Sequence, residues 1–417
     1  MSAPVLVDFA FALNIPTTTF VLNSASQGLL DTNLLASPDT MSDFSTRRVI
    51  SFSVERTSSI TYGPVIAYNA GTASITLLDD DGALDPKTLE AGGFVAPGTL
   101  MRIRYVFNDM AYPIFYGYVD TWIPNQISPT MATVTITATD GFSLLNTALG
   151  TLGSPVGANE LSGARVSRLL DAAGWAASLR SIAAGDSQLQ ATSFGGAALD
   201  LIQEVAKNEL GEFYQQPDGV MYFRNRHGLF ADTRSTVSQA TYGTNFAGGE
   251  LPYSGSIEGA WDKTQLHNSA IVGIEGGTVQ TRTDGTSAGR FGTRTFEETG
   301  LILTTDSDAL NWGGEVISRD KDPVFRFTSV TLDSGFDPDH PVTIQQVTRR
   351  LGDRVTVIRR PPGVATDSRD VYIRGISHAY GNHRLKTSFA LQPVTSFPGF
   401  TLDSATQGVL NTSVLTY

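Results

Sequence analysis

Residues 48–55 read RVISFSVE, a stretch in which apolar and small polar side chains alternate. Ile50, Phe52 and Val54 fall on one side of an extended chain, and the residues between them fall on the other. A repeat of two residues is what a strand needs when one face is buried and the other meets water. The stretch therefore predicts a half-buried β-strand.

Further segments with strand character follow in two groups, separated by a region of different composition. Each segment is rich in β-branched and aromatic residues and is bounded by Gly, Pro, Asn or Asp. The first group holds residues 71–77, 100–107, 114–122 and 132–139, and the second holds residues 325–332, 354–359, 371–377 and 385–391. Several short strands with such boundaries favour a small antiparallel barrel or sandwich.

The two groups weakly resemble each other. The segments that correspond are 98–105 with 352–359, 114–119 with 372–377, and 133–139 with 386–391. Placing Gly117 on Gly375 keeps apolar residues in register, although few residues are identical. Two related barrels would produce this pattern, and so would convergence of two β-rich segments.

Between the groups, the spacing of apolar residues becomes helical. Residues 165–175 and 198–210 place apolar side chains on one helix face, and Gly174 and Gly211 stand where the helices would end. Residues 212–226, EFYQQPDGVMYFRNR, predict a hairpin because the PDG turn separates two runs of strand-forming residues. The middle region is therefore predicted to be a small α/β module.

The fold class that follows is mainly β with an α+β insertion, in which two related small β-barrels flank the α/β module. Residues 231–262 are rich in loop-forming residues, and residues 308–319 predict a short helix with Ser307 as its N-cap. The expected divisions are an N-terminal arm at 1–44, a first barrel at 45–145, the α/β module at 146–262, a second barrel at 263–395 and a C-terminal arm at 396–417.

The two arms carry a repeated segment. Residues 20–35 read FVLNSASQGLLDTNLL and residues 400–415 read FTLDSATQGVLNTSVL, with nine of sixteen positions identical. An arm this short can bury its apolar side chains only against another surface. We expect two arms that bind equivalent sites on a symmetric partner; an edge strand folded onto its own domain is the alternative. The assembly residues expected are Phe20, Leu22, Gln27, Gly28, Leu30, Leu34, Phe400, Leu402, Gln407, Gly408, Leu410 and Val414.

Composition excludes several classes of function. Lys and Arg number 29 against 41 Asp and Glu, a formal net charge of −12, which argues against broad binding to nucleic acid phosphates because such binding needs clustered cations. The absence of cysteine excludes disulfides, thiolate metal sites and cysteine nucleophiles. We expect no signal peptide, because the first residues lack a basic region and are interrupted by Asp8 and Pro16. We expect no stable membrane insertion, because no apolar run reaches ~18 residues.

Candidate chemical sites are weak. Asp79, Asp80 and Asp81 precede Gly82, but a calcium-binding EF-hand loop needs its glycine at the sixth position rather than the fourth. A turn in which these side chains hydrogen-bond the backbone is the better interpretation. Glu297 and Glu298 are adjacent and would point to opposite faces of a strand. The histidines, which show no zinc-binding spacing, are His227, His267, His340, His378 and His383. No catalytic, cofactor-binding or metal-binding residues are therefore predicted, and no enzymatic activity.

The order of motifs resembles a known family. The succession RRVISFSVERTSS, GTASITLLDDDGALDP, PGTLMRIRY, IFYGYVDTW and VTITATDGF resembles the first domain of tail-hub or minor tail proteins of long-tailed phages, especially phages of actinobacteria. The segments RVSRLLDAAGW, EFYQQPDGVMYFRNR, SAGRFGTR, GDRVTVIRRPP and VYIRGISHAY are similar to its later domains. The resemblance spans most of residues 45–395, and none of the motifs is a catalytic signature.

This resemblance implies a baseplate-hub protein, in which two related barrels flank an α/β module and three chains form a ring. The expected function is that of a structural virion protein at the tail tip. As a homotrimer it would close the distal tail tube, adapt sixfold to threefold symmetry, and line the path of DNA and tape-measure protein. The expected partners are a hexameric ring at the tube end, the tape-measure protein and other tail-tip or fibre proteins, with DNA passing through and not bound specifically.

A tail-tip adhesin that binds host surface glycan is the alternative function. Aromatic side chains form sugar-binding platforms, although in β-rich domains they more often belong to the core. The candidates are Trp122, Trp175, Trp261, Trp312 and Tyr112. Glycan binding by the purified chain would favour the adhesin, and a stable trimer without binding would favour the hub.

Overall fold

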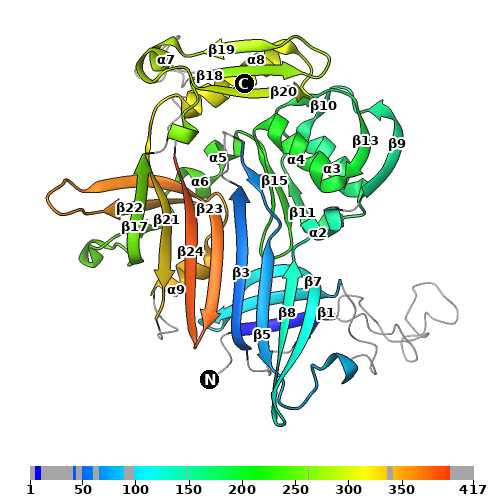
Figure 1. Ribbon diagram of the computed structural model, residues 1–417, viewed down its shortest axis with the longest axis vertical. Helices are drawn as coiled ribbons and strands as arrows, with labels where there is room; N and C mark the ends of the chain where they lie inside the picture. The colour runs from blue at the N-terminus through cyan, green and yellow to red at the C-terminus, as the bar shows by residue number, and fades with distance from the viewer. Residues whose placement is uncertain are drawn as a thin grey trace.

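Figure 1 shows the computed structural model, which describes residues 5–10, 41–43, 49–59, 65–88, 98–146, 148–261, 263–335 and 341–394. Within these ranges the chain is mainly β, with helices concentrated in two smaller α/β parts, as the sequence predicts. The expected assembly residues of both arms lie outside the described ranges. None of the helices described is long and apolar enough to cross a membrane.

The first group of strands forms one antiparallel unit in the order β3-β5-β8-β7-β6. Its strands are β3 (Val49–Ser59), β5 (Thr72–Leu78), β6 (Leu100–Phe107), β7 (Met110–Ser128) and β8 (Met131–Thr139), with the short β4 (Ala67–Tyr68) beside β3. All five predicted strands of this unit are confirmed, and β7 extends beyond its predicted range at both ends.

The second group forms a unit with the same strand order, β17-β21-β24-β23-β22. Its strands are β17 (Ser254–Trp261), β21 (Phe325–Asp333), β22 (Arg354–Arg359), β23 (Asp367–Gly381) and β24 (Arg384–Pro393). The strand β17 lies within residues 231–262, which the sequence predicts to be loop-rich. Its sequence SGSIEGAW contains too much Gly and Ser to show strand propensity, so pairing with β21 determines its conformation.

The two units are joined edge to edge. β23 pairs with β3 along the register that runs from Gly375 opposite Thr57 to Gly381 opposite Ser51. Figure 1 shows the resulting sheet with β17, β21, β24, β23, β3, β5 and β8 side by side. The predicted barrels are therefore parts of one continuous sheet.

A shared hydrogen-bond pattern supports a correspondence between the two units. The amide of Gly98 donates to the carbonyl of Val119 at 2.9 Å, and the amide of Gly352 donates to the carbonyl of Ile373 at 2.7 Å. In each unit the residue after the acceptor lies where the ladder with the following strand shifts its register. This residue is Asp120 in the β7–β8 ladder and Arg374 in the β23–β24 ladder. Val119 therefore corresponds to Ile373.

This register corrects the sequence alignment of Gly117 with Gly375. The structural offset is 373 − 119 = 254 residues, whereas the aligned glycines are 375 − 117 = 258 residues apart. The difference is four residues. Because strand patterning repeats every two residues, an even shift leaves apolar positions in register and cannot be detected from periodicity.

The first unit curls around its own core. Tyr105 of β6 and Tyr380 of β23 have ring centroids 6.3 Å apart, so the curvature brings β6 back towards the second unit. Part of the segment 1–44, expected as an arm, contributes strands to this sheet next to β6. The elements added to the unit are β1 (Val5–Ala10), β2 (Met41–Asp43) and α9 (Pro341–Thr348).

The middle α/β module packs over one end of the sheet (Figure 1). The two predicted helices and the predicted hairpin are present as α3, α4 and β14–β15. Its elements are α2 (Phe142–Leu145), β9 (Ala148–Val156), β10 (Glu160–Leu161), α3 (Ser162–Ala172), η1 (Ala177–Leu179), β11 (Arg180–Ile182), β12 (Gln188–Leu189), β13 (Thr192–Ala197), α4 (Ala198–Glu209), β14 (Glu212–Gln215), β15 (Met221–Arg224), α5 (Gly228–Ala231), α6 (Thr233–Thr236), β16 (Thr241–Tyr242) and η2 (Phe246–Gly248).

A small separate sheet precedes the last strands. Its elements are η3 (Lys263–Gln265), β18 (Ser269–Ile274), β19 (Gln280–Thr283), α7 (Gly285–Phe291), β20 (Thr295–Leu301) and α8 (Asp306–Asp320). Gly313 lets α8 lie close to β18, because a Cβ there would stand 3.2 Å from Val272. The N-cap of α8 is Thr305 and not the predicted Ser307, since Thr305 forms a reciprocal capping box with Asp308.

Candidate functional site

The outer face of the joined sheet carries rows of small polar side chains. Residues that pair across neighbouring strands point to the same side of a sheet. One row crosses the sheet from β17 to β7 through Ser254, Thr331, Ser388, Ser377, Glu55, Thr72, Thr139 and Tyr118. Six of these eight residues are serine or threonine, so short hydroxyl side chains dominate the row.

The next row has the same character. It runs through Asp333, Lys386, Ala379, Ser53, Ser74, Thr137 and Thr121. Residues between these positions, such as Phe52, Ile75 and Ile136, point to the opposite side and are buried in the core of the first unit. The sheet therefore has one apolar face and one face of short polar side chains, as strand periodicity requires.

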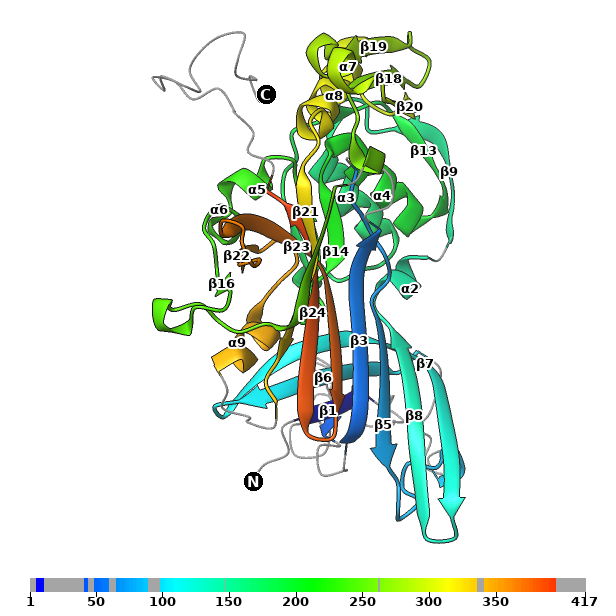
Figure 2. The same cartoon turned by 60° about the vertical axis from the view of Figure 1, so that its left-hand side comes forward.

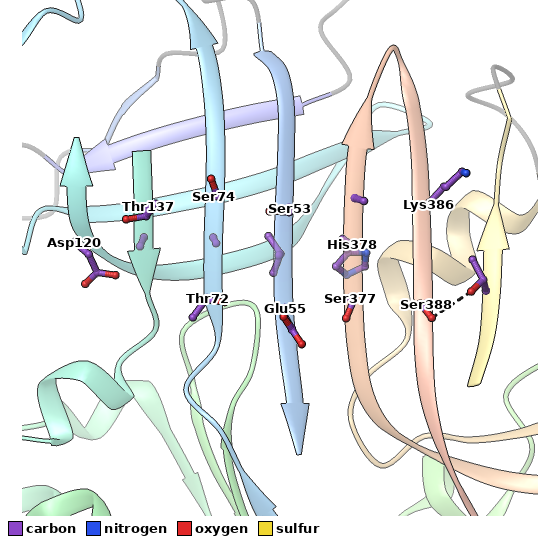
Figure 3. A pocket seen from close by; sticks show the side chains of 15 residues that line it. Ser53, Glu55, Thr72, Ser74, Asp120, Thr137, Ser377, His378, Lys386 and Ser388 are labelled. Atoms are coloured by element: carbon purple, nitrogen blue, oxygen red, sulfur yellow. Dashed lines mark hydrogen bonds between the residues drawn. The ribbon is translucent and has the colours of Figure 1, made fainter. Parts of the chain in front are cut away.

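An open groove of about 530 Å³ follows these rows. Figure 3 shows its labelled side chains on successive strands of the sheet. The ionic residues of the lining, apart from the buried His378, are Glu55, Asp120 and Lys386. The groove is thus open to solvent and lined by short side chains, and it is not an enclosed ligand cavity.

Hydroxyl groups on this face bond to one another across strands. Thr121 and Thr137 hydroxyls are 2.6 Å apart, and the Thr139 hydroxyl donates to Asp120 at 2.6 Å. Such cross-strand pairs each stabilise a sheet by roughly 0.2–1 kcal/mol.

The lysine of the groove lies near a carboxylate that it shares with an arginine. Lys386 Nζ lies 3.7 Å from an Asp333 carboxylate oxygen, and Arg384 donates two hydrogen bonds to the same carboxylate. Although burial opposes ionisation, these bonds hold the pKa of Asp333 below its usual range. An anion that reached Lys386 would therefore compete with a carboxylate already in place.

Beneath the groove lies an imidazole that stays neutral. His378 is 3% exposed, and its Nδ1 is 2.9 Å from the Thr387 hydroxyl. Burial, aided by the nearby charge of Arg56, lowers the pKa of His378 to about 3. Burial also raises the pKa of Asp140, the carboxylate near Arg56, to about 7. Since His378 is uncharged at neutral pH, it adds no positive charge to the groove.

A buried ionic cluster ties the middle module to the second unit. Glu212 of β14 accepts hydrogen bonds from Arg224 of β15 at 2.7 Å and from Arg374 of β23. The Tyr68 hydroxyl donates to the same carboxylate at 3.3 Å. Burial alone would raise the pKa of Glu212, but the two guanidinium groups lower it to about 2. The cluster fixes the module above the end of the groove.

Known proteins match this chain in fold but not in sequence. No family model and no curated protein matches the sequence. The 43 kDa tail protein of prophage MuSo2 from Shewanella oneidensis matches the structure with a TM-score of 0.55 at 13% identity, covering 85% of this chain and 96% of that chain. A tail protein from Neisseria meningitidis gives a TM-score of 0.58 at 11% identity, covering 94% and 97%. The chain has the fold of phage tail proteins.

These matches confirm that the chain has the fold implied by the sequence resemblance to phage tail proteins. A component of the Escherichia coli type VI secretion system, which is itself similar to phage T4 tail proteins, gives a TM-score of 0.49 at 10% identity. That match covers 84% of this chain and 74% of the other, and its score is too low to support a conclusion.

Residues that the sequence singled out are dispersed over the tail-protein fold. The acidic run forms the predicted turn, because the Leu84 amide donates to Asp79 at 3.0 Å and the Ala83 amide to Asp81 at 3.1 Å. Within the described ranges, no three His, Asp or Glu residues lie together as a metal site would require. Of the aromatic candidates, Trp312 is 1% exposed and Trp261 is 69% exposed, so Trp261 is the one clearly available at the surface.

The hydroxyl rows are a feature that sequence reasoning missed. The signal was present in VTITAT, where Thr135, Thr137 and Thr139 stand at every second position of β8. A single strand of this kind indicates only an exposed face. The rows become visible when β8, β5, β3 and β23 are placed side by side, and that order cannot be read from periodicity.

Proposed function

We propose that this chain is a structural protein of a phage tail, a homotrimeric hub at the tail tip whose hydroxyl-lined sheet face lines the channel. The observation that carries the proposal is the polar face itself, on a chain with the tail-protein fold. A channel wall must be wetted by water and must not hold what passes. Rows of serine and threonine, with one lysine that is already paired, satisfy both conditions.

The chemistry of the face suits the passage of DNA. Proteins that hold DNA do so mainly through arginine and lysine contacts with phosphates, and their affinity grows with the number of such contacts. The groove lining contains Glu55 and Asp120 as well as the paired Lys386, so it offers no cluster of cations. The net charge of −12 acts in the same direction over the whole chain.

The internal repeat suits a symmetry adapter. Each chain contains two related five-stranded units, so three chains arranged around an axis would present six similar units. Six units can meet a hexameric ring at the tube end, while the chain as a whole keeps threefold symmetry. The repeated arms would then provide six similar segments for that ring or for surrounding tip and fibre proteins.

The mass of the purified chain in solution tests this proposal. Light scattering over a range of concentrations should give three times the mass of one chain. A monomer at every concentration would contradict the homotrimeric hub. If that monomer also bound host glycans, and if Trp261→Ala abolished the binding, the adhesin would replace the hub as the better account.

A deletion tests the arms separately. Removing residues 400–417 should leave the thermal unfolding of the chain unchanged, while weakening its incorporation into tail tips assembled in vitro. Deletion of residues 1–4 is a matched control of terminal truncation. Unchanged incorporation of the 400–417 deletion would contradict the assembly role of the C-terminal arm.

A further inference from the structure

An aromatic and ionic surface patch lies where β17, β21 and the β22–β23 hairpin meet. Trp261 at the end of β17 faces Phe325 at the start of β21, and their ring centroids are 6.0 Å apart. The guanidinium carbons of Arg359 on β22 and Arg369 on β23 lie 5.1 and 5.3 Å from the centre of the Phe325 ring. Together with Asp367, the carboxylate that both arginines approach, these residues form the Trp261 patch.

The Trp261 patch is distant from the groove. Figure 1 shows β17 on the flank of the molecule opposite to β7 and β8, and Figure 2 shows β22 on the same flank. None of the patch residues belongs to the lining of the groove. The patch is therefore a separate surface, and the proposed channel wall does not explain its chemistry.

The indole of the patch is exposed but firmly placed. Trp261 is 69% exposed, more than any other large apolar side chain within the described ranges. A Cβ at Gly259 of β17 would stand 2.4 Å from Cζ of Phe325, so only glycine leaves room for the Phe325 ring. Arg369 also donates to the carbonyl of Phe325 at 3.2 Å. The indole therefore rests against a fixed ring while most of its surface meets water.

The patch carries an excess of positive charge. Arg369 Nε donates to Asp367 at 2.8 Å, whereas the ion pair of Arg359 with the same carboxylate is 4.0 Å long, beyond hydrogen-bond range. Arg359 Nε is buried without an acceptor among the described residues, although 36% of the side chain is exposed. One carboxylate thus faces two guanidinium groups, and a charge of +1 is left at the surface.

The related first unit shows that the sheet does not require these arginines. With the offset of 254 residues, Arg359 corresponds to Tyr105 and Arg369 corresponds to Phe115. Both aromatic residues are buried in the core of the first unit. Arginines therefore stand in the second unit where the first unit has core residues, and packing of the sheet does not account for them.

We propose that the Trp261 patch binds an acidic saccharide, with one sugar ring stacked on Trp261 and its carboxylate held by Arg359. The C–H groups on one face of a sugar ring form an apolar surface, which an exposed indole can cover. A guanidinium binds a carboxylate through charge-assisted hydrogen bonds that two parallel N–H groups can share. A single carboxylate supplies the one negative charge that the patch lacks.

The charge balance favours a carboxylated sugar over other ligands with flat faces. Binding of nucleic acid needs several cations along a phosphate backbone, whereas this patch has a charge of +1 on a chain of net charge −12. A neutral sugar would leave Arg359 without a counter-ion, so it should bind less tightly. Because the arginines are half-buried and the site is open, we expect weak binding, with a Kd on the order of 1 mM.

The inference does not depend on the homotrimeric hub. On a trimer the patch would be present three times, so that a long polysaccharide would bind more tightly than a single sugar. Binding by a trimer would add saccharide contact to the functions of the hub. Binding by a monomer would favour the adhesin.

Isothermal titration calorimetry of the full chain with trigalacturonate tests the proposal, and neutral galactotriose is the matched ligand. We expect the acidic trisaccharide to bind at least about tenfold more tightly than the neutral one. Trp261→Ala and Arg359→Gln should each weaken its binding at least about tenfold. Val279→Ala and Arg282→Gln remove exposed side chains at the separate small sheet and should leave binding unchanged. Thermal unfolding of each variant shows whether its fold is intact.

Three results would overturn the proposal. The first is no binding of trigalacturonate up to about 20 mM. The second is binding that a folded Trp261→Ala variant retains in full, because the ligand would then lie elsewhere. The third is equal affinity for galactotriose, or displacement of trigalacturonate by an equal concentration of inorganic phosphate, because the patch would then not recognise a carboxylated sugar.

Discussion

Arg374 and Ser377 lie three residues apart on β23, yet they belong to opposite environments. Arg374 is 2% exposed and bonds to Glu212 within the ionic cluster, while Ser377 lies on the hydroxyl face over the groove. In these two regions, the paired charges of the cluster are buried, and most side chains on the hydroxyl face are small and neutral. The opposite arrangement is usual, because charged side chains are rarely buried unless they are paired.

The proposed function would account for the difference between the two regions. A buried ion pair is a weak source of net stability, but it is costly to break and therefore fixes one arrangement of the parts that it joins. A channel wall, which is the role proposed for the hydroxyl face, would need no such specificity, because it would contact whatever passes. The cluster should therefore be sensitive to single changes, and the hydroxyl face should tolerate them.

The largest effect is expected at Glu212. Glu212→Gln would leave Arg224 and Arg374 buried without a counter-ion, which should lower the free energy of unfolding by about 3–5 kcal/mol. Denaturant unfolding at pH 7 measures this loss. Glu258→Gln removes an exposed carboxylate on β17 and should change the free energy by less than about 0.5 kcal/mol. A loss below about 1 kcal/mol at Glu212 would mean that the cluster does not fix the module.

The cluster also shows the limit of sequence-based prediction. Glu212 and Arg374 are 162 residues apart, and each lies in a segment that the sequence correctly predicts to be a strand. Strand prediction succeeds because burial of one face imposes a period of two on each segment separately. Nothing in that period shows which strands become neighbours, so neither the cluster nor the β23–β3 junction could be predicted.

The hydroxyl face could not be predicted for the same reason. In the α/β parts, the helices were predicted correctly but their exact ends were not. Helices α3 and α4 were predicted because the helical repeat is local. The N-cap of α8 was assigned to Ser307 and not Thr305, because both residues favour that position and the capping box is decided by geometry. The strand β17 has no local signal at all.

The next largest effect is the pH dependence of folding stability that His378 causes. Its folded pKa, about 3, lies below the ordinary histidine value of 6.5, so below pH 6.5 the unfolded chain binds a proton that the folded chain does not. Stability is then lost as the pH falls from about 6.5 towards 3. Asp140, with its pKa raised to about 7, acts in the opposite sense, since its contribution is lost as the pH rises towards 7.

Substitution separates the two groups. His378→Asn keeps a partner for Thr387 but cannot be protonated, so the variant should lose less stability than the wild type between pH 7 and pH 5, by about 2 kcal/mol. Denaturant unfolding at both pH values measures this difference. His383→Asn removes an exposed imidazole at the tip of the β23–β24 hairpin and serves as the matched control. Equal pH dependence of the wild type and His378→Asn would show that His378 does not remain neutral in the fold.

The smallest effect is expected on the hydroxyl face itself. Thr137→Val preserves the shape of the side chain and removes its hydrogen bond to Thr121, and Ser53→Ala removes an exposed hydroxyl. Each should change the free energy of unfolding by about 1 kcal/mol or less, in contrast to Ile136→Ala on the buried face of the sheet, which should cost about 2–5 kcal/mol. Denaturant unfolding of the three variants measures the loss of unfolding free energy on each face of the sheet. A loss above about 2 kcal/mol for Ser53→Ala would show that the hydroxyl rows stabilise the fold, and the reason for placing them on a channel wall would then disappear, because their chemistry would be explained by stability alone.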